Sequence, residues 1–254
     1  MLEQTGFLIE ETFSQIGKIG KLFIQGLIGT FQLKFKFSDV YVQMVKIGIE
    51  SLSASLVTGL FVGMVFAVQI ANEFVKFGAG KVVGGIVAIA IARELAPILT
   101  GVVMAGRVGA GIAAEIGTMR VTQQIDALET LGASPIRYLV IPRLIAGALM
   151  LPLLTLLSSV IGFFGGYWVA AYFANINSYA YFEAAEQFMK MSDIFGGLFK
   201  AFLFGALITT ISCYQGLNAK NGAKGVGEST TSAVVISLIS LFIFNYFLSI
   251  AIFK

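Results

Sequence analysis

Four long stretches without a charged side chain, and a fifth interrupted only by Arg93 and Glu94, constrain the fold of this 254-residue chain more than any other feature. A hydrocarbon core about 30 Å thick is crossed by about 20 mostly apolar residues of α-helix. Each stretch is about that long or longer, so the sequence predicts five membrane-spanning helices. They are Ser51–Asn72, Val82–Gly106, Leu144 to about Tyr172, Ala201–Ala219 and Ser229–Phe253.

The composition supports this interpretation and excludes a water-soluble protein. Hydrophobic residues make up 57% of the chain and charged residues make up 12%, about half of the roughly 25% that is typical of soluble domains. The chain has no histidine and a single cysteine, Cys213, which permits no intrachain disulfide and none of the usual structural zinc sites. We therefore expect an all-α integral membrane protein without a metal site.

The lysines and arginines between the predicted spans indicate the orientation. When the N-terminus is placed in the cytoplasm, the inner segments carry eleven of these residues and the outer segments carry five, with Arg93 counted as intramembrane. Cytoplasmic segments are enriched in lysine and arginine, so the N-terminus is predicted inside and the C-terminus outside. The five outer residues are Lys76, Lys81, Lys190, Lys200 and Lys254.

Residues 1–46 resemble neither a span nor a signal peptide. Their apolar positions recur at helical spacing, at Phe13, Ile16, Gly20, Ile24, Leu27 and Phe31. This pattern, with lysines turned away, is typical of a basic amphipathic helix in the membrane interface. The alternative is a cytoplasmic helix packed on a partner. We expect a single domain over 1–254, with an interfacial region at 1–46 and a transmembrane bundle at 47–254.

Small residues recur four positions apart along the predicted spans. Lipid tails provide no hydrophobic force between helices, so close backbone approach at small residues stabilises their association. We expect ordinary helix packing within one subunit at these pairs. They are Gly59 and Gly63, Gly80 and Gly84, Ala110 and Ala114, and Gly162 and Gly166.

A polar segment separates the second and third predicted spans. Its apolar stripe consists of Val121, Ile125, Leu128 and Leu131, and its polar face of Gln123, Asp126, Glu129 and Thr130. Gly132 has the position of a helix C-cap, and Pro135 prevents continuation. The polar face carries more acid than base, which suits a protein groove better than an anionic membrane surface. The sequence predicts a short cytoplasmic amphipathic helix that packs on a partner.

The same part of the chain closely resembles the MlaE-type permeases, the membrane subunits of ABC transporters that move lipids between membranes. The best match is AGRVGAGIAAEIGTMRVTQQIDALETLGASPIRYLVIPR at residues 105–143, and RELAPILTG at 93–101 and GLFVGMVFAVQ at 59–69 also fit. The run LGASPIRYLVIP at 131–142 is similar to the loop of other ABC permeases in which a coupling helix sits in a groove on the ATPase. One departure is Gln123, where the family often has glutamate.

The resemblance implies a homodimer with two ABC ATPase subunits on the cytoplasmic face and a ring of MCE-domain lipid-binding proteins outside. Membrane lipid, most simply phospholipid, would occupy a cavity between the two copies, walled by the first, second and fifth spans. ATP binding would move the coupling helices, at about Ile116–Leu131, and squeeze that cavity. The residues expected to take part in coupling are Glu115, Arg120, Gln123, Asp126, Glu129, Gly132 and Pro135.

The chain offers no recognisable nucleotide site. A phosphate-binding loop requires G-x-x-x-x-G-K-[ST], and the nearest match has Val75 and Val82 in place of the first glycine and the final hydroxyl residue. No histidine can act as a base, and the acidic residues form no evident carboxylate pair. We expect no catalytic residue and no cofactor in this chain, with ATP and Mg²⁺ bound by a separate ATPase subunit.

Arg93 and Glu94 interrupt the second predicted span. A charge at the centre of a membrane helix costs about 2.5–3.5 kcal/mol, so these residues need polar partners. Adjacent helical side chains point in different directions, and the pair cannot satisfy itself. Either the two residues border the lipid path, with Arg93 binding phosphate and Glu94 bonding to Arg93 of a twofold-related copy, or they form a polar clamp between helices.

Two other classes of function stay open at this stage. One is a membrane-embedded lipid-modifying enzyme, for which the sequence offers no activated nucleophile, no histidine base and no carboxylate pair. The other is a secondary transporter, which would show inverted repeats and several buried ionisable groups, whereas the sequence shows one charged doublet and no repeat. Nothing suggests nucleic acid as a partner. The family places the chain in the inner membrane of a diderm bacterium, as a multi-pass protein. The composition would also suit a plastid inner envelope.

Overall fold

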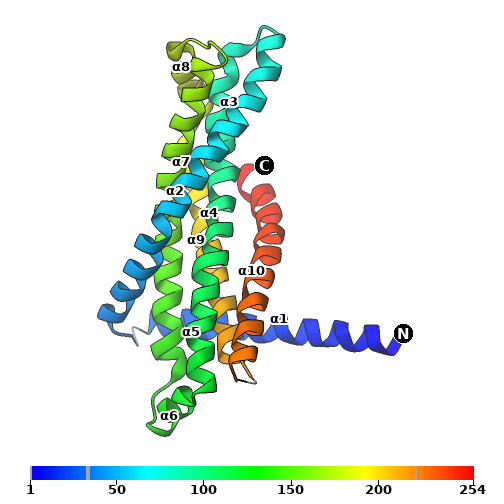
Figure 1. The fold of residues 1–254 in the computed structure, drawn as a ribbon, viewed down its shortest axis with the longest axis vertical. Coiled ribbons are helices and arrows are strands. Elements are labelled where there is room, and N and C mark those ends of the chain that lie inside the picture. Colours follow the sequence, from blue (N-terminus) through cyan, green and yellow to red (C-terminus); the bar gives the residue numbers. More distant parts are fainter. Residues whose placement is uncertain (1, 33–34, 221) are drawn as a thin grey trace.

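The computed structural model describes residues 2–32, 35–220 and 222–254, and its regular elements in these ranges are all helices. A helix named α1 (Leu2–Phe31) lies across one end of a bundle of five long helical segments (Figure 1). Each of the five is long and apolar enough to cross a membrane. They are Phe37–Lys76, Gly80–Val121, Ile136–Tyr172, Met191–Leu217 and Gly222–Phe253. The predicted all-α fold with five spans is confirmed.

The second span is divided by two π-helical turns. In order, its pieces are η1 (Gly80–Val82), α3 (Val83–Ala90), η2 (Ile91–Leu95), α4 (Ala96–Met104), η3 (Ala105–Gly109) and α5 (Ala110–Val121). The π turn η2 contains Arg93 and Glu94, and η3 contains Arg107. Turns of this kind inside α-helices are frequent at functional sites.

The remaining elements define two ends of the bundle. The first, fourth and fifth spans are α2 (Phe37–Lys76), α9 (Met191–Leu217) and α10 (Gly222–Phe253), and the third joins η4 (Ile136–Val140) to α7 (Ile141–Tyr172). The short helices α6 (Gln124–Thr130) and α8 (Ser178–Phe188) lie at opposite ends (Figure 1). We call these the α6 end and the α8 end; the predicted orientation places the α6 end in the cytoplasm.

All five spans begin earlier than the sequence predicted, the first and the fourth by the most. The first begins at Phe37 rather than Ser51, so residues 37–46 belong to α2 and not to the interfacial region. The fourth begins at Met191 rather than Ala201, because Lys200 lies inside the helix with its side chain fully buried. Lys200 is therefore not an outer-loop residue. Arg143, which is buried within α7, leaves the inner group for the same reason, and the charge comparison becomes ten against four. The orientation it indicates is unchanged.

The first helix keeps much of its predicted apolar stripe exposed. Phe13, Ile16 and Phe31 are exposed, whereas Leu22 is buried and Gly26 lies against Leu144 at the start of α7. Figure 1 shows α1 lying across the long helices at the α6 end of the bundle. This arrangement is what an interfacial helix requires, and its placement in the membrane interface stays a prediction.

Glycines bring α2 and α7 into backbone contact. A Cβ atom on Gly63 would collide with the backbone of Gly162, and one on Gly59 would collide with Ser158. The Ser158 hydroxyl also donates to the Ser55 carbonyl, at 3.2 Å. The small residues of the first and third spans therefore pack within one subunit, as predicted.

We expect Gly63→Ala to lower the free energy of unfolding by about 1–3 kcal/mol, because the methyl group forces two tightly packed backbones apart. Thermal unfolding of the purified protein in detergent measures the change. The matched control is Gly111→Ala in α5, an exposed helical position where a Cβ meets nothing within 4 Å. Equal stability of the two variants would contradict the prediction.

Candidate functional site

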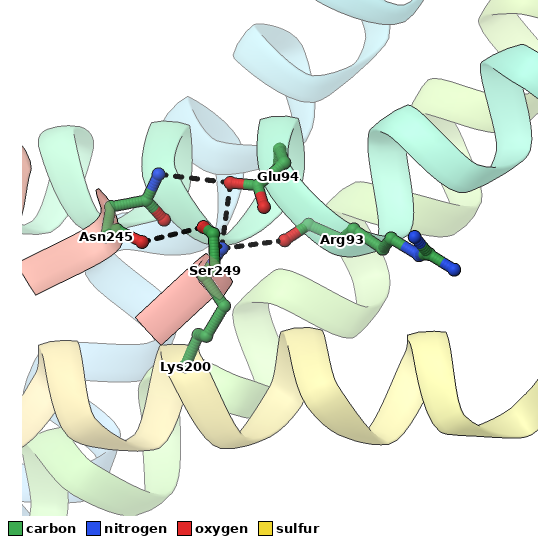
Figure 2. Close-up of polar contacts among 5 residues, drawn as sticks. All are labelled: Arg93, Glu94, Lys200, Asn245 and Ser249. Carbon is green, nitrogen blue, oxygen red and sulfur yellow. Dashed lines mark hydrogen bonds and ion pairs between the residues drawn. The ribbon is translucent and has the colours of Figure 1, made fainter. Parts of the chain in front are cut away.

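Arg93 and Glu94 lie in the π turn η2 and point toward different neighbours. Glu94 faces α10 and α9, and Arg93 extends away from it along α9, as Figure 2 shows. The structure thus separates the two side chains, as expected for adjacent residues of a helix, and each finds its partners within the same chain.

Glu94 is the centre of a hydrogen-bonded network with three helices. Its Oε2 atom lies 2.8 Å from Lys200 Nζ and accepts a hydrogen bond from Asn245 Nδ2, at 3.0 Å (Figure 2). Lys200 also donates to the Arg93 carbonyl, at 3.1 Å, and to Ser249 Oγ, at 2.9 Å. All three ammonium hydrogens of the buried lysine therefore have acceptors, which offsets the cost of its burial.

Arg93 makes a second ion pair with the beginning of α9. Its Nη2 atom lies 2.9 Å from Oδ1 of Asp193, whose side chain is almost fully buried. The other oxygen of Asp193 accepts from the Lys190 backbone N–H, at 2.9 Å. The guanidinium carbon also lies 4.9 Å from the centre of the Phe253 ring, within the range of a cation–π contact.

The two ion pairs form one neutral unit, which we call the charge cluster: Arg93, Glu94, Asp193, Lys200, Asn245 and Ser249. It has two cations and two anions, and joins the second, fourth and fifth spans. Within one chain Glu94 pairs with Lys200, and the predicted bond to Arg93 of a second copy stays a prediction. A clamp between helices accounts for these contacts, while Glu94 remains 38% exposed and accessible from a groove beside α10.

Sequence reasoning missed four members of the charge cluster. Asp193 and Lys200 lie outside the predicted fourth span, Ala201–Ala219, although their spacing of seven puts them on one face of a helix. Asn245 and Ser249 are four positions apart and therefore also lie on one face of a helix. Ser249 donates to the Asn245 carbonyl, at 2.7 Å.

A second ionic group lies toward the α6 end and includes Glu115, one of the predicted coupling residues. Its Oε2 atom lies 2.8 Å from Lys46 Nζ, and its Oε1 atom lies 3.1 Å from Arg143 Nη2. Arg143 is buried and also donates to the Leu139 carbonyl, at 2.8 Å. Glu115, whose side chain stays 39% exposed, therefore joins α2, α5 and α7.

The other predicted coupling residues surround α6. The region predicted to hold the coupling helix, at about Ile116–Leu131, consists of the end of α5 and of α6: α5 ends at Val121, Gln123 adopts a left-handed conformation with φ 61°, and α6 begins at Gln124. Arg120 forms an ion pair with Asp126 across this break. The break turns α6 away from the axis of the second span, so that it caps the α6 end of the bundle (Figure 1).

The end of α6 agrees with the sequence prediction. Gly132, with φ 74°, follows the helix, and the Ala133 N–H bonds back to the Leu128 carbonyl, at 2.9 Å. This is the Schellman pattern that favours glycine. Pro135 directly precedes η4, where the third span begins.

The exposed surface of α6 contains both polar and apolar residues. Gln123, Asp126 and Glu129 are exposed, as predicted. Of the predicted apolar stripe, Ile125 is buried in the bundle but Leu131 is 82% exposed. The Leu131 side chain is therefore an exposed apolar group beside the polar face of α6.

The family model described as "Permease MlaE" matches residues 40–251. A probable ABC transporter permease protein of Synechocystis is 47% identical over 207 residues, which cover 82% of this chain and 79% of the relative. Another from Rickettsia typhi is 47% identical over 84% of this chain and 82% of the relative.

A plant relative extends the comparison to plastids. The Arabidopsis thaliana protein TRIGALACTOSYLDIACYLGLYCEROL 1, chloroplastic, is 42% identical over 85% of this chain and 62% of the relative. The five spans and these relatives agree with a multi-pass membrane protein of a bacterial inner membrane or a plastid envelope.

Proposed function

Because the chain belongs to the MlaE permease family of ABC transporters, we propose that it forms the lipid path of an ATP-driven transporter that moves lipids, most simply phospholipids, between membranes. The observation that carries this proposal is the exposed helix α6, held at one end of the bundle between the second and third spans. A coupling helix needs this position, because it must contact a soluble ATPase and move two spans together.

The contacts behind α6 support its role in coupling. The Arg120–Asp126 ion pair links it to α5, and Glu115 in α5 binds Lys46 in α2 and Arg143 in α7. A displacement of α6 by an ATPase would therefore act on three spans. The expected ATPase binds ATP and Mg²⁺, and this chain contributes no catalytic residue.

The proposed lipid path runs beside the charge cluster. A groove of about 650 Å³ lies between Glu94 and the fifth span, within the usual range of about 300–1,000 Å³ for small-molecule sites. Its lining residues beside Glu94 are Phe242, Asn245, Tyr246, Ser249, Ile250 and Phe253 of the fifth span, and Lys254 directly after it. In this proposal a second copy of the chain closes the groove into a cavity, and an MCE-domain protein receives or delivers lipid at the α8 end.

The lipid cargo has one further support. The name of the Arabidopsis relative contains that of a lipid, trigalactosyldiacylglycerol. The apolar groove with a few polar groups suits a molecule that has both a hydrocarbon and a polar part.

Gentle affinity purification of the tagged chain, followed by mass spectrometry, tests the proposal. We expect an ATPase with a complete phosphate-binding loop, an MCE-domain protein and a second copy of the chain. The purified assembly should then transfer labelled phospholipid between vesicles when ATP is added, and not with ATP omitted. An assembly without an ATPase, even after crosslinking in the membrane, would contradict the proposal, as would transfer that does not require ATP.

A further inference from the structure

A separate apolar groove lies between the second, third and fourth spans. We propose that it binds one acyl chain of a membrane lipid as a fixed component of the fold. The groove has a volume of about 190 Å³. Its floor includes the buried residues Ile91 and Thr155, and its rim includes Val160 and Phe164, which are about half exposed on the outer face of α7. The proposal does not rest on lipid transport.

The chemistry of the floor favours hydrocarbon over water. Ser159 Oγ donates to the Thr155 carbonyl, at 2.8 Å, and is thereby occupied. Thr155 Oγ1 has no hydrogen-bond partner among the described residues. A bound water needs about two to four polar partners, whereas an engineered apolar cavity of about 150 Å³ stays dry and binds benzene. This larger groove therefore suits an apolar occupant.

The dimensions select an acyl chain rather than a protein helix. Along α7 the groove extends from Thr155 to Phe164, which at 1.5 Å per residue is about 13.5 Å. Thr155 lies near the middle of the third span, Ile136–Tyr172, so the groove covers about half of a hydrocarbon core about 30 Å thick. An acyl chain of the leaflet at the α8 end has this reach. A helix about 10 Å across would need several times the volume.

The groove is distinct from the one beside Glu94. It is lined by Ile91 and Ala92 of the second span, by α7, and by Ile194 and Leu198 of α9, without a residue of α10. A chain in this groove would pack against the π turn η2, on the side away from the fifth span. It would therefore support the helical segment that carries Arg93 and Glu94 without entering the proposed lipid path.

A phospholipid with a photoactivatable diazirine in its acyl chain tests the proposal. The full chain, purified with its bound subunits, is reconstituted in vesicles of phosphatidylethanolamine and phosphatidylglycerol with a trace of this lipid. After illumination, mass spectrometry locates the adducts. We expect them to concentrate on the groove residues between Thr155 and Phe164.

Ser159→Phe places a ring in the groove from a half-buried position. We expect groove adducts to fall about tenfold, equivalent to about 1.4 kcal/mol of binding free energy. The matched control is Leu157→Phe, which adds a ring to an exposed position on the same helix outside the groove and should leave the labelling unchanged. If the phenylalanine ring prevents folding, Ser159→Leu is the replacement variant, and we expect it also to reduce the groove adducts.

Two results would overturn the proposal. One is labelling spread evenly over the lipid-facing residues of α7 and α10 in the wild-type protein. The other is a groove that crosslinks to a segment of a bound subunit instead of lipid. The labelling is measured without ATP, so its failure would leave the transport proposal intact. Labelling of the groove in a protein that does not transfer lipid would support this proposal and contradict the transport proposal.

Discussion

Replacement of Lys200 by methionine is expected to lower the free energy of unfolding by about 3–5 kcal/mol, the usual cost of removing one partner of a buried ion pair. The Lys200 side chain is fully buried, and its ammonium group donates to Glu94, Ser249 and the Arg93 carbonyl. Without it, the Asn245 amide is the one remaining hydrogen-bond partner of the Glu94 carboxylate among the described residues. Unfolding in detergent, followed by circular dichroism, measures the loss.

Removal of both charges should recover most of that stability. In Lys200→Met with Glu94→Gln, no unpaired charge remains, and the glutamine still accepts from Asn245. Lys81→Met is the matched control, because Lys81 is exposed and such surface changes alter stability by about 0.5 kcal/mol or less. The account of the charge cluster fails if Lys200→Met is as stable as the wild type, or if the double variant is no more stable than the single one.

The double variant also decides between the two roles of the charge cluster. If it folds, assembles and still transfers lipid at the wild-type rate, Glu94 and Lys200 form only a clamp between helices. If it folds and assembles but transfers lipid at least about tenfold more slowly, a loss of about 1.4 kcal/mol in transition-state stabilisation, the charges act in the lipid path.

The five spans could be predicted because their length and apolar composition are local properties of the chain. Their boundaries could not, because a search for charge-free stretches ends a span at its first charge. Lys200 shows the error: it lies within α9, and its burial is tolerable because its acceptors come from other spans, among them Glu94, more than 100 positions earlier. The first span shows the same error: its predicted start directly follows Glu50, although Glu50 and Lys46 both lie within α2, where Lys46 pairs with Glu115.

The candidate site was likewise predicted in part. Arg93 and Glu94 were evident because they interrupt an apolar segment, but their partners depend on how three spans pack. For Glu115, the sequence predicted a part in coupling, which stays a prediction. The sequence did not reveal the partners of its carboxylate, Lys46 and Arg143, because these residues lie on two other spans.

The largest effect on assembly is expected from Leu131→Asp at the end of α6. Leu131 is 82% exposed and directly follows the helix that we propose contacts the ATPase. If it fills an apolar pocket there, an aspartate would bury an unpaired charge and cost about 2 kcal/mol or more, at least about a 30-fold loss of affinity. The amount of ATPase that co-purifies with the tagged chain measures this loss.

Phe77→Asp provides the matched control for Leu131→Asp. Phe77 is also 82% exposed but lies just after α2, at the α8 end, where the predicted orientation places no ATPase. It should leave the recovery of the ATPase unchanged, while both variants insert in the membrane and elute as single species. Loss of the ATPase in Phe77→Asp but not in Leu131→Asp would reverse the predicted orientation. If neither substitution reduced recovery, the apolar contact at Leu131 would be excluded as an anchor of the coupling helix.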